Sequence, residues 1–387
     1  MSEASTRKDG MTSTTFIHTS DFQLGMTRRF LGESAQARYS DDREAAVLRL
    51  GDLAKETGAQ FILVAGDVFE HNSLSQATLL RAKEMFKRLP VPVYLLPGNH
   101  DPLVADSVFY RASAENVHVI ADSQSFEVAP GVELVGAPYL SKHANVDLVR
   151  QALEPLEPAE GIRIAVGHGQ VESWSAEDNA DAIDLAYVES KLSEGVIDYL
   201  ALGDTHSTMS LGTTGRVWFS GSPETTDFLQ LPAGKGEADS GNALVVTVGE
   251  DSVEVDKRRI GRWSFEAFDV DINSAQDVRG FLARLDAYPD KIRTAIKYGL
   301  RGTVGLEEQR ELELGLAQYE ALFASLRPRQ RTMDLHLAPS EEELATLGLG
   351  GYASTALEEL LGALDRPEAR DAANLLFRLT ATEEKSR

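Results

Sequence analysis

The sequence repeats one pattern: an apolar run rich in β-branched residues ends in polar side chains that can bind a metal ion. Five segments have this pattern, and their ends read SDFQLG, GDVFE, GNHD, GHG and GDTH. Near-continuous apolar runs are typical of strands that are covered on both faces. Because the carboxyl ends of parallel strands meet at one edge of a sheet, we expect these polar side chains to converge there. The pattern therefore predicts a layered α/β fold with a site at that edge.

In the first two thirds of the chain, such runs alternate with amphipathic helical patterns. Helices are predicted at residues 41–57 and 74–89, where charged and apolar residues have helical spacing. The predicted strands are residues 16–20, 61–67, 91–99, 132–138, 162–168, 199–206, 217–223, 243–248 and 252–255. His18 lies inside the first of these strands, and we expect it to be a packed residue rather than a metal ligand.

A second, smaller α/β unit is predicted after Arg262, where the order of elements changes. Its predicted strands are residues 265–272, 293–303 and 332–337, and its predicted helices are residues 274–285 and 307–326. Beyond Pro339 the chain is predicted to be helical, with a capping box formed by Ser340 and Glu343. The expected organisation is a flexible N-terminus (1–14), a main domain (15–262), a smaller domain (263–338) and a C-terminal helical segment (339–387).

The composition limits the chemistry that is available to the site. The chain of 387 residues contains no cysteine, which excludes thiolate metal ligands, disulfides and a cysteine nucleophile. A metal ion must therefore be held by histidine, carboxylate or amide groups. The net charge of -23 argues against strong unaided binding to nucleic acid, so such a function requires metal ions, a local basic strip or a partner.

The sequence also bears on location. Its first fifteen residues are polar and lack the apolar core of a secretion signal. No later stretch reaches the ~18 apolar residues of a membrane-spanning helix. We therefore expect a cytoplasmic protein that has no membrane partner.

Taken singly, each motif has an ordinary structural explanation, since Asp21 and Asp67 can cap helices and Asn99 can form part of a turn. Taken together, the motifs match the needs of phosphate-ester hydrolysis: an activated water, a Lewis acid, and a way to offset charge on the leaving group. Two metal ions ~3.5–4 Å apart supply these functions. Asp67 is the candidate for the carboxylate that both ions share. The mixture of oxygen and imidazole ligands fits Mn, Mg, Fe or Zn.

The ordered set of motifs resembles the calcineurin-like metallophosphoesterases, and more narrowly the SbcD-type DNA repair exonucleases. HTSDFQLG is similar to the HTSDWHLG of that group, GDVFE to its GDVFD, GNHD to its GNHD, and GDTH to its GHxH. The likeness extends to GAPY, SGSPETTDF and KGE, and it covers roughly residues 15–260. It implies a layered β-sandwich metallophosphoesterase domain flanked by helices, with the smaller α/β unit in the place of the capping domain and a helical C-terminus.

Carried over residue by residue, the resemblance implies two metal sites and a neighbouring acid. One ion would be held by Asp21, Gln23, Asp67 and His206, and the other by Asp67, Asn99, His168 and Asp204. His100 would stand beside the scissile phosphate, where it stabilises the transition state or protonates the leaving oxygen. Asp101 would be its orienting partner.

Two positions depart from the family pattern, because Gln23 and Asp204 stand where the family has histidine. Both exchanges replace an imidazole nitrogen by oxygen. We expect this to shift the preference toward Mn, with Mg or Fe as alternatives, and away from Zn. Since a glutamine amide is a neutral and weak ligand, the ion next to Gln23 is expected to bind more loosely.

The resulting expectation is a metal-dependent hydrolase, a two-metal phosphodiesterase that acts as a DNA repair exonuclease or endonuclease. The partners implied by the resemblance are DNA, an SbcC-like coiled-coil ATPase and a second copy of the chain. One alternative is a metallophosphoesterase that acts on a small phosphodiester or a phosphoprotein. Another is a noncatalytic scaffold subunit of an ATPase complex, in which Gln23 and Asp204 mark lost metal binding.

Overall fold

The computed structural model describes residues 13–112, 114–171, 180–249, 252–337 and 352–363, together with residues 366, 368, 369, 372 and 373. It divides into two compact units, the first of Met1–Phe228 and Lys235–Ser264 and the second of Leu229–Gly234 and Phe265–Arg387. Most of the expected N-terminal segment, and the expected capping box at Ser340 and Glu343, lie outside the described residues.

The first unit contains two six-stranded sheets. The strands of one sheet are, in spatial order, β14 (Val253–Arg259), β13 (Asn242–Gly249), β1 (Ser13–Thr19), β2 (Ile62–Val64), β3 (Val93–Leu95) and β4 (Val117–Val119). Those of the other are β5 (Phe126–Ala129), β6 (Val132–Gly136), β7 (Ile162–His168), β8 (Tyr199–Gly203), β10 (Val217–Phe219) and β9 (Met209–Leu211). The run from β1 to β4 is parallel, as are β6, β7, β8 and β10, so several carboxyl ends share an edge.

The apolar strands fill two cores at once, because successive side chains of a strand point to opposite faces. Leu63 lies in the core between the two sheets, together with Ile164 of β7. Its neighbour Ile62 faces the other way and packs in the core that contains Leu50 of α1 (Glu33–Thr57). Since both faces of β2 are buried, the strand has no polar side, which explains its uninterrupted apolar sequence.

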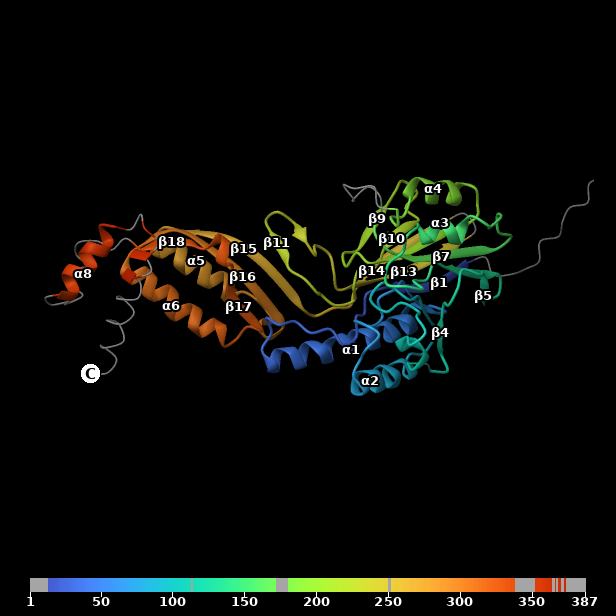
Figure 1. The fold of residues 1–387 in the computed structure, drawn as a ribbon, viewed down its shortest axis with the longest axis horizontal. Coiled ribbons are helices and arrows are strands. Elements are labelled where there is room, and N and C mark those ends of the chain that lie inside the picture. The colour runs from blue at the N-terminus through green and yellow to red at the C-terminus, as the bar shows by residue number, and fades with distance from the viewer. Residues whose placement is uncertain are drawn as a thin grey trace, which may run out of the picture. The chain divides into compact units, whose positions relative to one another are not determined.

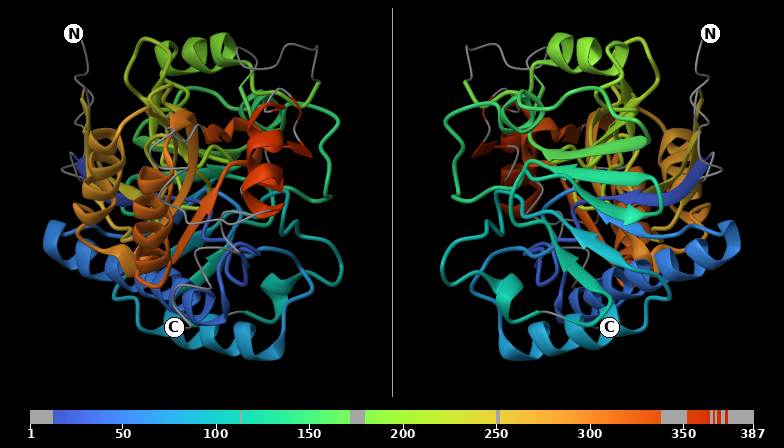
Figure 2. Two further views of the ribbon diagram at one scale, coloured as in Figure 1. Left: turned by 90° about the vertical axis from the view of Figure 1, so that its left-hand side faces the viewer. Right: turned by 90° about the vertical axis from the view of Figure 1, so that its right-hand side faces the viewer.

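Helices cover the outer face of each sheet. The first sheet packs against α1 and α2 (Gln76–Lys87), and Ser75 caps α2, since its Oγ accepts the Thr78 N–H at 3.1 Å. The second sheet packs against α3 (Leu148–Leu153) and α4 (Leu185–Ser193). Figure 2 shows the two blue helices on one side of the stacked sheets and α4 on the other. This arrangement confirms the predicted layered α/β fold with helices flanking a β-sandwich.

The second unit is a smaller α/β assembly with its own core. Its strands are β11 (Leu229–Leu231), β15 (Ser264–Ile272), β16 (Thr294–Val304), β17 (Ser325–Pro328) and β18 (Asp334–Leu337). Its helices are α5 (Ala275–Asp286), α6 (Leu306–Glu320) and α8 (Tyr352–Leu361), and the two-residue strand β12 (Lys235–Gly236) follows β11 in the chain. Phe281 of α5 and Leu312 of α6 pack with Phe268 of β15, and Figure 1 shows both helices lying against the strands.

Two features of this unit differ from expectation. The helix predicted at residues 307–326 ends at Glu320, and Ser325–Pro328 forms β17, which pairs parallel with β16. Burial decides the difference, because Leu326 reaches the core as a strand residue, and Pro328 is tolerated at the end of an edge strand. In addition, Leu229–Gly234 belongs to the second unit, although it lies within residues 15–262 of the chain.

No helix within the described ranges combines the length and the apolarity that a membrane crossing requires.

Candidate metal centre

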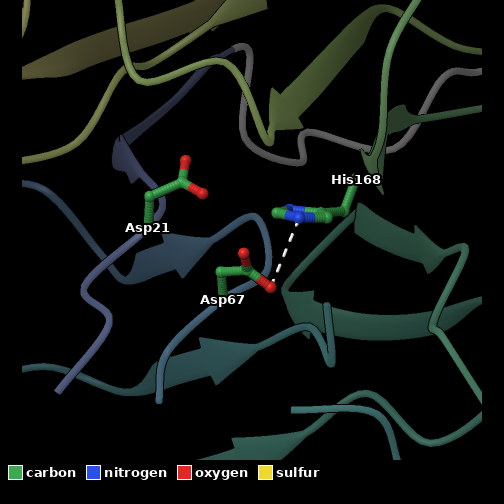
Figure 3. Close-up of side chains that lie close together, drawn as sticks. All are labelled: Asp21, Asp67 and His168. Carbon is green, nitrogen blue, oxygen red and sulfur yellow. Dashed lines mark ion pairs between the residues drawn. The ribbon is translucent and has the colours of Figure 1, made fainter. Parts of the chain in front are cut away.

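The polar residues that end the apolar runs gather at the carboxyl ends of strands from both sheets. Asp21 follows β1, Asp67 follows β2, Asn99 and His100 follow β3, His168 ends β7, and Asp204 and His206 follow β8. Parallel strands of both sheets therefore deliver side chains to one place, as the sequence pattern predicts. Figure 3 shows Asp21, Asp67 and His168 pointing toward one another at this edge.

Asp21, Asp67 and His168 form the centre of the cluster. All three are buried, and one ligand atom of each lies within 4.8 Å of the others. His168 Nε2 lies 3.4 Å from Asp67 Oδ1, while its Nδ1 lies 2.8 Å from the carbonyl oxygen of Ala65. Because a carbonyl oxygen only accepts hydrogen bonds, Nδ1 carries the proton in the neutral ring and the lone pair of Nε2 faces Asp67.

Asn99 and Asp204 adjoin the same face of His168. Asn99 Oδ1 lies 3.1 Å from His168 Nε2, and Asp204 Oδ1 lies 3.8 Å from the same atom. Side chains from several strand ends thus surround one point, and they are the residues expected to hold one of the two ions: Asp67, Asn99, His168 and Asp204.

A second group lies around Asp21 and His206. His206 Nε2 lies 3.8 Å from Asp21 Oδ1 and 3.4 Å from Gln23 Nε2. The backbone N–H of Asp204 donates to Asp21 Oδ2 at 3.3 Å, which joins this group to the first. The structure therefore brings together every residue that the sequence predicted as a ligand.

His100 lies at the rim of the cluster. Its backbone N–H donates to Asp67 Oδ1 at 3.0 Å, and its ring Nδ1 lies 3.0 Å from the carbonyl oxygen of Glu70. Asp101 was expected to orient the ring of His100, but its carboxylate makes other contacts. Asp101 is buried, and its two oxygens accept the N–H groups of Phe69 and Gly98, both at 2.8 Å. Asp101 thus fastens the two metal-site loops to each other, and the Glu70 carbonyl holds the ring of His100.

The backbone at the site adopts conformations that most residues avoid. Asp21, Gln23, Asp67 and Asp204 have φ angles of 54°, 41°, 53° and 96°, and among the described residues they are the non-glycine residues with positive φ. Such conformations cost roughly 1–3 kcal/mol each and persist only where the surroundings enforce them. Gly98 packs closely against Asp67 and helps to hold its backbone in this conformation. A Cβ at position 98 would lie 2.2 Å from Asp67 Oδ1 and 2.5 Å from the backbone nitrogen of Asp67.

The electrostatics of the cluster favour positive charge. Burial lowers the pKa of His206, but Glu237 and Asp21 outweigh it and raise that pKa to about 9. The pKa of His168 is likewise raised, because the charge of Asp67 outweighs the effect of burial. Burial also opposes ionisation of Asp67, yet the neighbouring His168 holds the pKa of Asp67 below its ordinary value. Asp21 differs, since its burial raises its pKa despite His206 and His168.

The donors present fit divalent metal ions. Asp21 Oδ1 and Gln23 Oε1 are buried and have no hydrogen-bond partner among the described residues. An unpaired buried polar atom typically costs ~1–3 kcal/mol, and a cation between these oxygens would remove that cost. The remaining donors are carboxylate and amide oxygens and imidazole nitrogens, which suit ions such as Mn and Mg and lack the thiolates of a structural zinc site.

Sequence reasoning assigned no role to three residues that support the site. Glu237 accepts a hydrogen bond from the ring of His206, and Thr226 contacts the same ring nitrogen. The buried Arg43 donates to the carbonyl oxygen of Phe22, between Asp21 and Gln23. Thr226 lies in the SGSPETTDF segment and Glu237 in the KGE segment, and both segments resemble family motifs. Neither residue was predicted to end a strand, so nothing in the sequence indicated what these residues do.

Comparison with protein families matches residues 14–208 to the family described as calcineurin-like phosphoesterase. The chain is 26% identical over 312 residues to the uncharacterized metallophosphoesterase YhaO of Bacillus subtilis (strain 168), an alignment that covers 76% of this chain and 73% of YhaO. It is 30% identical over 99 residues to the DNA double-strand break repair protein Mre11 of Archaeoglobus fulgidus, which covers 25% of this chain and 21% of Mre11.

Among solved structures, the fold is similar to TT1561 of Thermus thermophilus, with a TM-score of 0.38 and 9% identity over 64% of this chain and 100% of that one. It is also similar to a dimetal phosphatase from Danio rerio, with a TM-score of 0.40 and 11% identity over 64% of this chain and 96% of that one.

Proposed function

The chain belongs to the calcineurin-like phosphoesterase family, and we propose that it is a two-metal-dependent phosphodiesterase of the SbcD type that hydrolyses DNA. The observation that carries this proposal is the position of Asp67. Its carboxylate lies 3.4 Å from His168 and within 4.8 Å of Asp21, so it adjoins both groups of donors. A carboxylate shared in this way is the centre that a two-metal site requires.

The ions proposed are divalent, with Mn the best fit to the oxygen-rich donors. Two ions held at the two groups of donors would supply Lewis acidity and an activated water for attack on the phosphate. Asp67 would keep them close together, while Gln23 gives one of them a weaker ligand.

The chain itself supplies a proton donor beside this centre. The side chain of His100 is 41% exposed, and the Glu70 carbonyl holds its Nδ1 as the donor. Its Nε2, 3.9 Å from Asp67 Oδ2, is therefore the ring atom that can give a proton to a leaving oxygen. Such a transfer requires that both ring nitrogens carry hydrogen.

Two observations support DNA as the substrate. One is the similarity to the repair protein Mre11, and the other is the set of motifs, from HTSDFQLG to SGSPETTDF, that resembles the SbcD group. The net charge of -23 makes unaided DNA binding weak. We therefore propose that an SbcC-like coiled-coil ATPase supplies DNA-binding surface, and that the chain acts as a homodimer with it.

The test is Mn-dependent degradation of end-labelled single- and double-stranded DNA, with and without such an ATPase. Wild type should degrade the DNA, and Asp67→Asn should lose the activity while it keeps the fold. Asp198→Asn is the matched control, since Asp198 accepts the Arg163 N–H at 2.8 Å away from the metal ligands. If Asp67→Asn cleaved DNA as fast as wild type, the proposal would be wrong.

Two other outcomes would point to the alternatives. Hydrolysis of a chromogenic phosphodiester without any cleavage of DNA would favour a small phosphodiester or a phosphoprotein as the substrate. Absence of bound metal at saturating Mn, together with full biological function of His100→Ala, would favour a noncatalytic scaffold.

A further inference from the structure

His206 is held by two oxygen atoms on the side of the ring that faces away from the metal ligands. Its Nδ1 lies 2.6 Å from Thr226 Oγ1 and 3.0 Å from Glu237 Oε1. Its Nε2 faces Asp21 and Gln23. The ring can bind an ion through Nε2 only if that atom carries a lone pair, so the location of the ring proton decides whether His206 is a ligand.

The hydrogen bonds around Nδ1 determine where this proton lies. Thr226 Oγ1 donates its single hydrogen to Glu237 Oε1 at 2.7 Å, so toward His206 it can only accept. The carboxylate of Glu237 also only accepts. Because both neighbours of Nδ1 are acceptors, Nδ1 carries the hydrogen, and in the neutral ring Nε2 presents its lone pair to the metal ligands.

Glu237 is itself held firmly. It is 7% exposed, and its second oxygen accepts the backbone N–H groups of Thr226 at 2.6 Å and Asp227 at 2.8 Å. These bonds fix the orientation of the carboxylate before any ion binds. The loop that follows β10 and the segment that follows β12 are thereby joined at the back of the His206 ring.

We propose that Glu237 is a positioning residue that fixes the Nδ1–H tautomer of His206 and makes Nε2 a stronger ligand, which offsets the weak ligand Gln23 on the same ion. A carboxylate behind a metal-binding imidazole raises the basicity of the ring, and loss of such a partner typically lowers metal affinity ~10–100-fold. The other histidine of the centre, His168, has only the Ala65 carbonyl behind it among the described residues. The carboxylate of Glu237 thus lies behind His206, the histidine that would share its ion with the amide of Gln23.

Glu237→Gln separates this role from simple packing, because the two backbone N–H groups require an oxygen where Glu237 has its second one. The glutamine amide therefore turns its NH₂ group toward His206 Nδ1. Nδ1 must then accept, the ring proton moves to Nε2, and the lone pair that faces Asp21 is lost. The variant keeps the volume of the side chain but reverses the tautomer.

A control variant isolates the effect. Glu224→Gln changes a carboxylate that is also buried and accepts the backbone N–H groups of Arg262 at 3.0 Å and Trp263 at 2.9 Å, but whose described hydrogen bonds include no metal ligand. We expect this control to bind metal like wild type.

The experiment is calorimetric titration of the metal-free full chain with Mn²⁺, supported by the visible absorption of bound Co²⁺ and by thermal unfolding of each metal-free variant. Wild type should bind two ions, and Glu237→Gln should bind one of them ~10–100-fold more weakly with a changed Co²⁺ spectrum. Unchanged affinity in Glu237→Gln, or an equal loss in Glu224→Gln, would overturn the inference.

The inference rests on the proposed metal centre but not on the substrate. A chain that binds Mn²⁺ with the expected loss in Glu237→Gln, yet cleaves no DNA, would remove the proposed function and leave this inference intact. A wild type that binds no Mn²⁺ would overturn both.

Discussion

Asp67 and His100 are joined twice: the backbone N–H of His100 donates to Asp67 Oδ1 at 3.0 Å, and its imidazole Nε2 lies 3.9 Å from Oδ2 of the same carboxylate. The first contact belongs to the backbone and survives a change of side chain. The second contact is made by the ring and is lost when the side chain is changed. A substitution at position 100 can therefore remove the proposed proton donor without releasing the carboxylate that is proposed to be shared.

His100→Ala should leave Mn²⁺ affinity within about twofold of wild type and lower kcat ~10²–10⁴-fold, the usual contribution of a general acid. Metal titration and steady-state hydrolysis of a phosphodiester, measured on the same preparation, check the two halves of the prediction. A matching fall in metal affinity and kcat would show instead that the ring acts as a ligand.

Gln23→His should bind the more weakly held ion roughly tenfold more tightly, a gain of ~1.4 kcal/mol. Imidazole is a stronger ligand than an amide, and histidine occurs in left-handed conformations more readily than glutamine, which matters because φ at this position is 41°. The measurement is the Mn²⁺ concentration that gives half-maximal activity. Failure to lower it would contradict the view that the amide limits binding.

Gly98→Ala should lower the free energy of unfolding by ~1–3 kcal/mol and weaken metal binding, because the new Cβ would lie 2.5 Å from the backbone nitrogen of Asp67. Gly280→Ala is the matched control, since Gly280 is in the interior of α5 and a Cβ there meets nothing within 4 Å. This control should gain ~0.5–1 kcal/mol from better helix propensity. Denaturant unfolding of both variants measures the two changes in the free energy of unfolding. A similar change in both variants would contradict the prediction.

His18 should make the protein more sensitive to acid. The ring is fully buried between Tyr199 and the carbonyl of Leu202, and burial lowers its pKa to about 3 even though the bond to that carbonyl opposes the shift. In the unfolded chain its pKa is about 6.5. As pH falls below about 6.5, His18 binds a proton in the unfolded chain but stays neutral in the folded chain. The free energy of unfolding therefore declines by ~1.4 kcal/mol per pH unit.

His18→Gln should therefore be less stable than wild type at pH 7 but should lose less stability between pH 6 and pH 4. Denaturant unfolding of both metal-free proteins across this range gives the two slopes. Parallel slopes would mean that His18 accepts a proton in the folded state.

The fold was predictable where a single strand is buried on both faces. The segment that forms β7 was predicted at residues 162–168, which are the bounds observed, because its residues are buried throughout and its sequence is mostly apolar. Elements whose residues are shared between core and solvent were harder to predict. The strand β17 was predicted as the end of a helix, since only its pairing with β16 reveals it.

The convergence of residues was predictable for those that stand at strand ends, because topology alone carries them to one edge. It was not predictable for Glu237 or Arg43, which reach the site through side chains rather than through strand order. Asp101 shows a third case. The family resemblance implied that Asp101 orients the ring of His100, but the carboxylate of Asp101 accepts the N–H groups of Phe69 and Gly98 instead.

The positive φ angles at four of the proposed ligand positions have a consequence for laboratory evolution of this chain. Glycine adopts these torsions without penalty, and asparagine adopts them at less cost than most residues. A library selected for heat tolerance alone should accumulate such replacements at these positions and lose turnover as it does so. A library selected for turnover should keep the residues at these positions unchanged. Comparison of the two libraries would therefore show which of these backbone torsions serve activity rather than thermal stability.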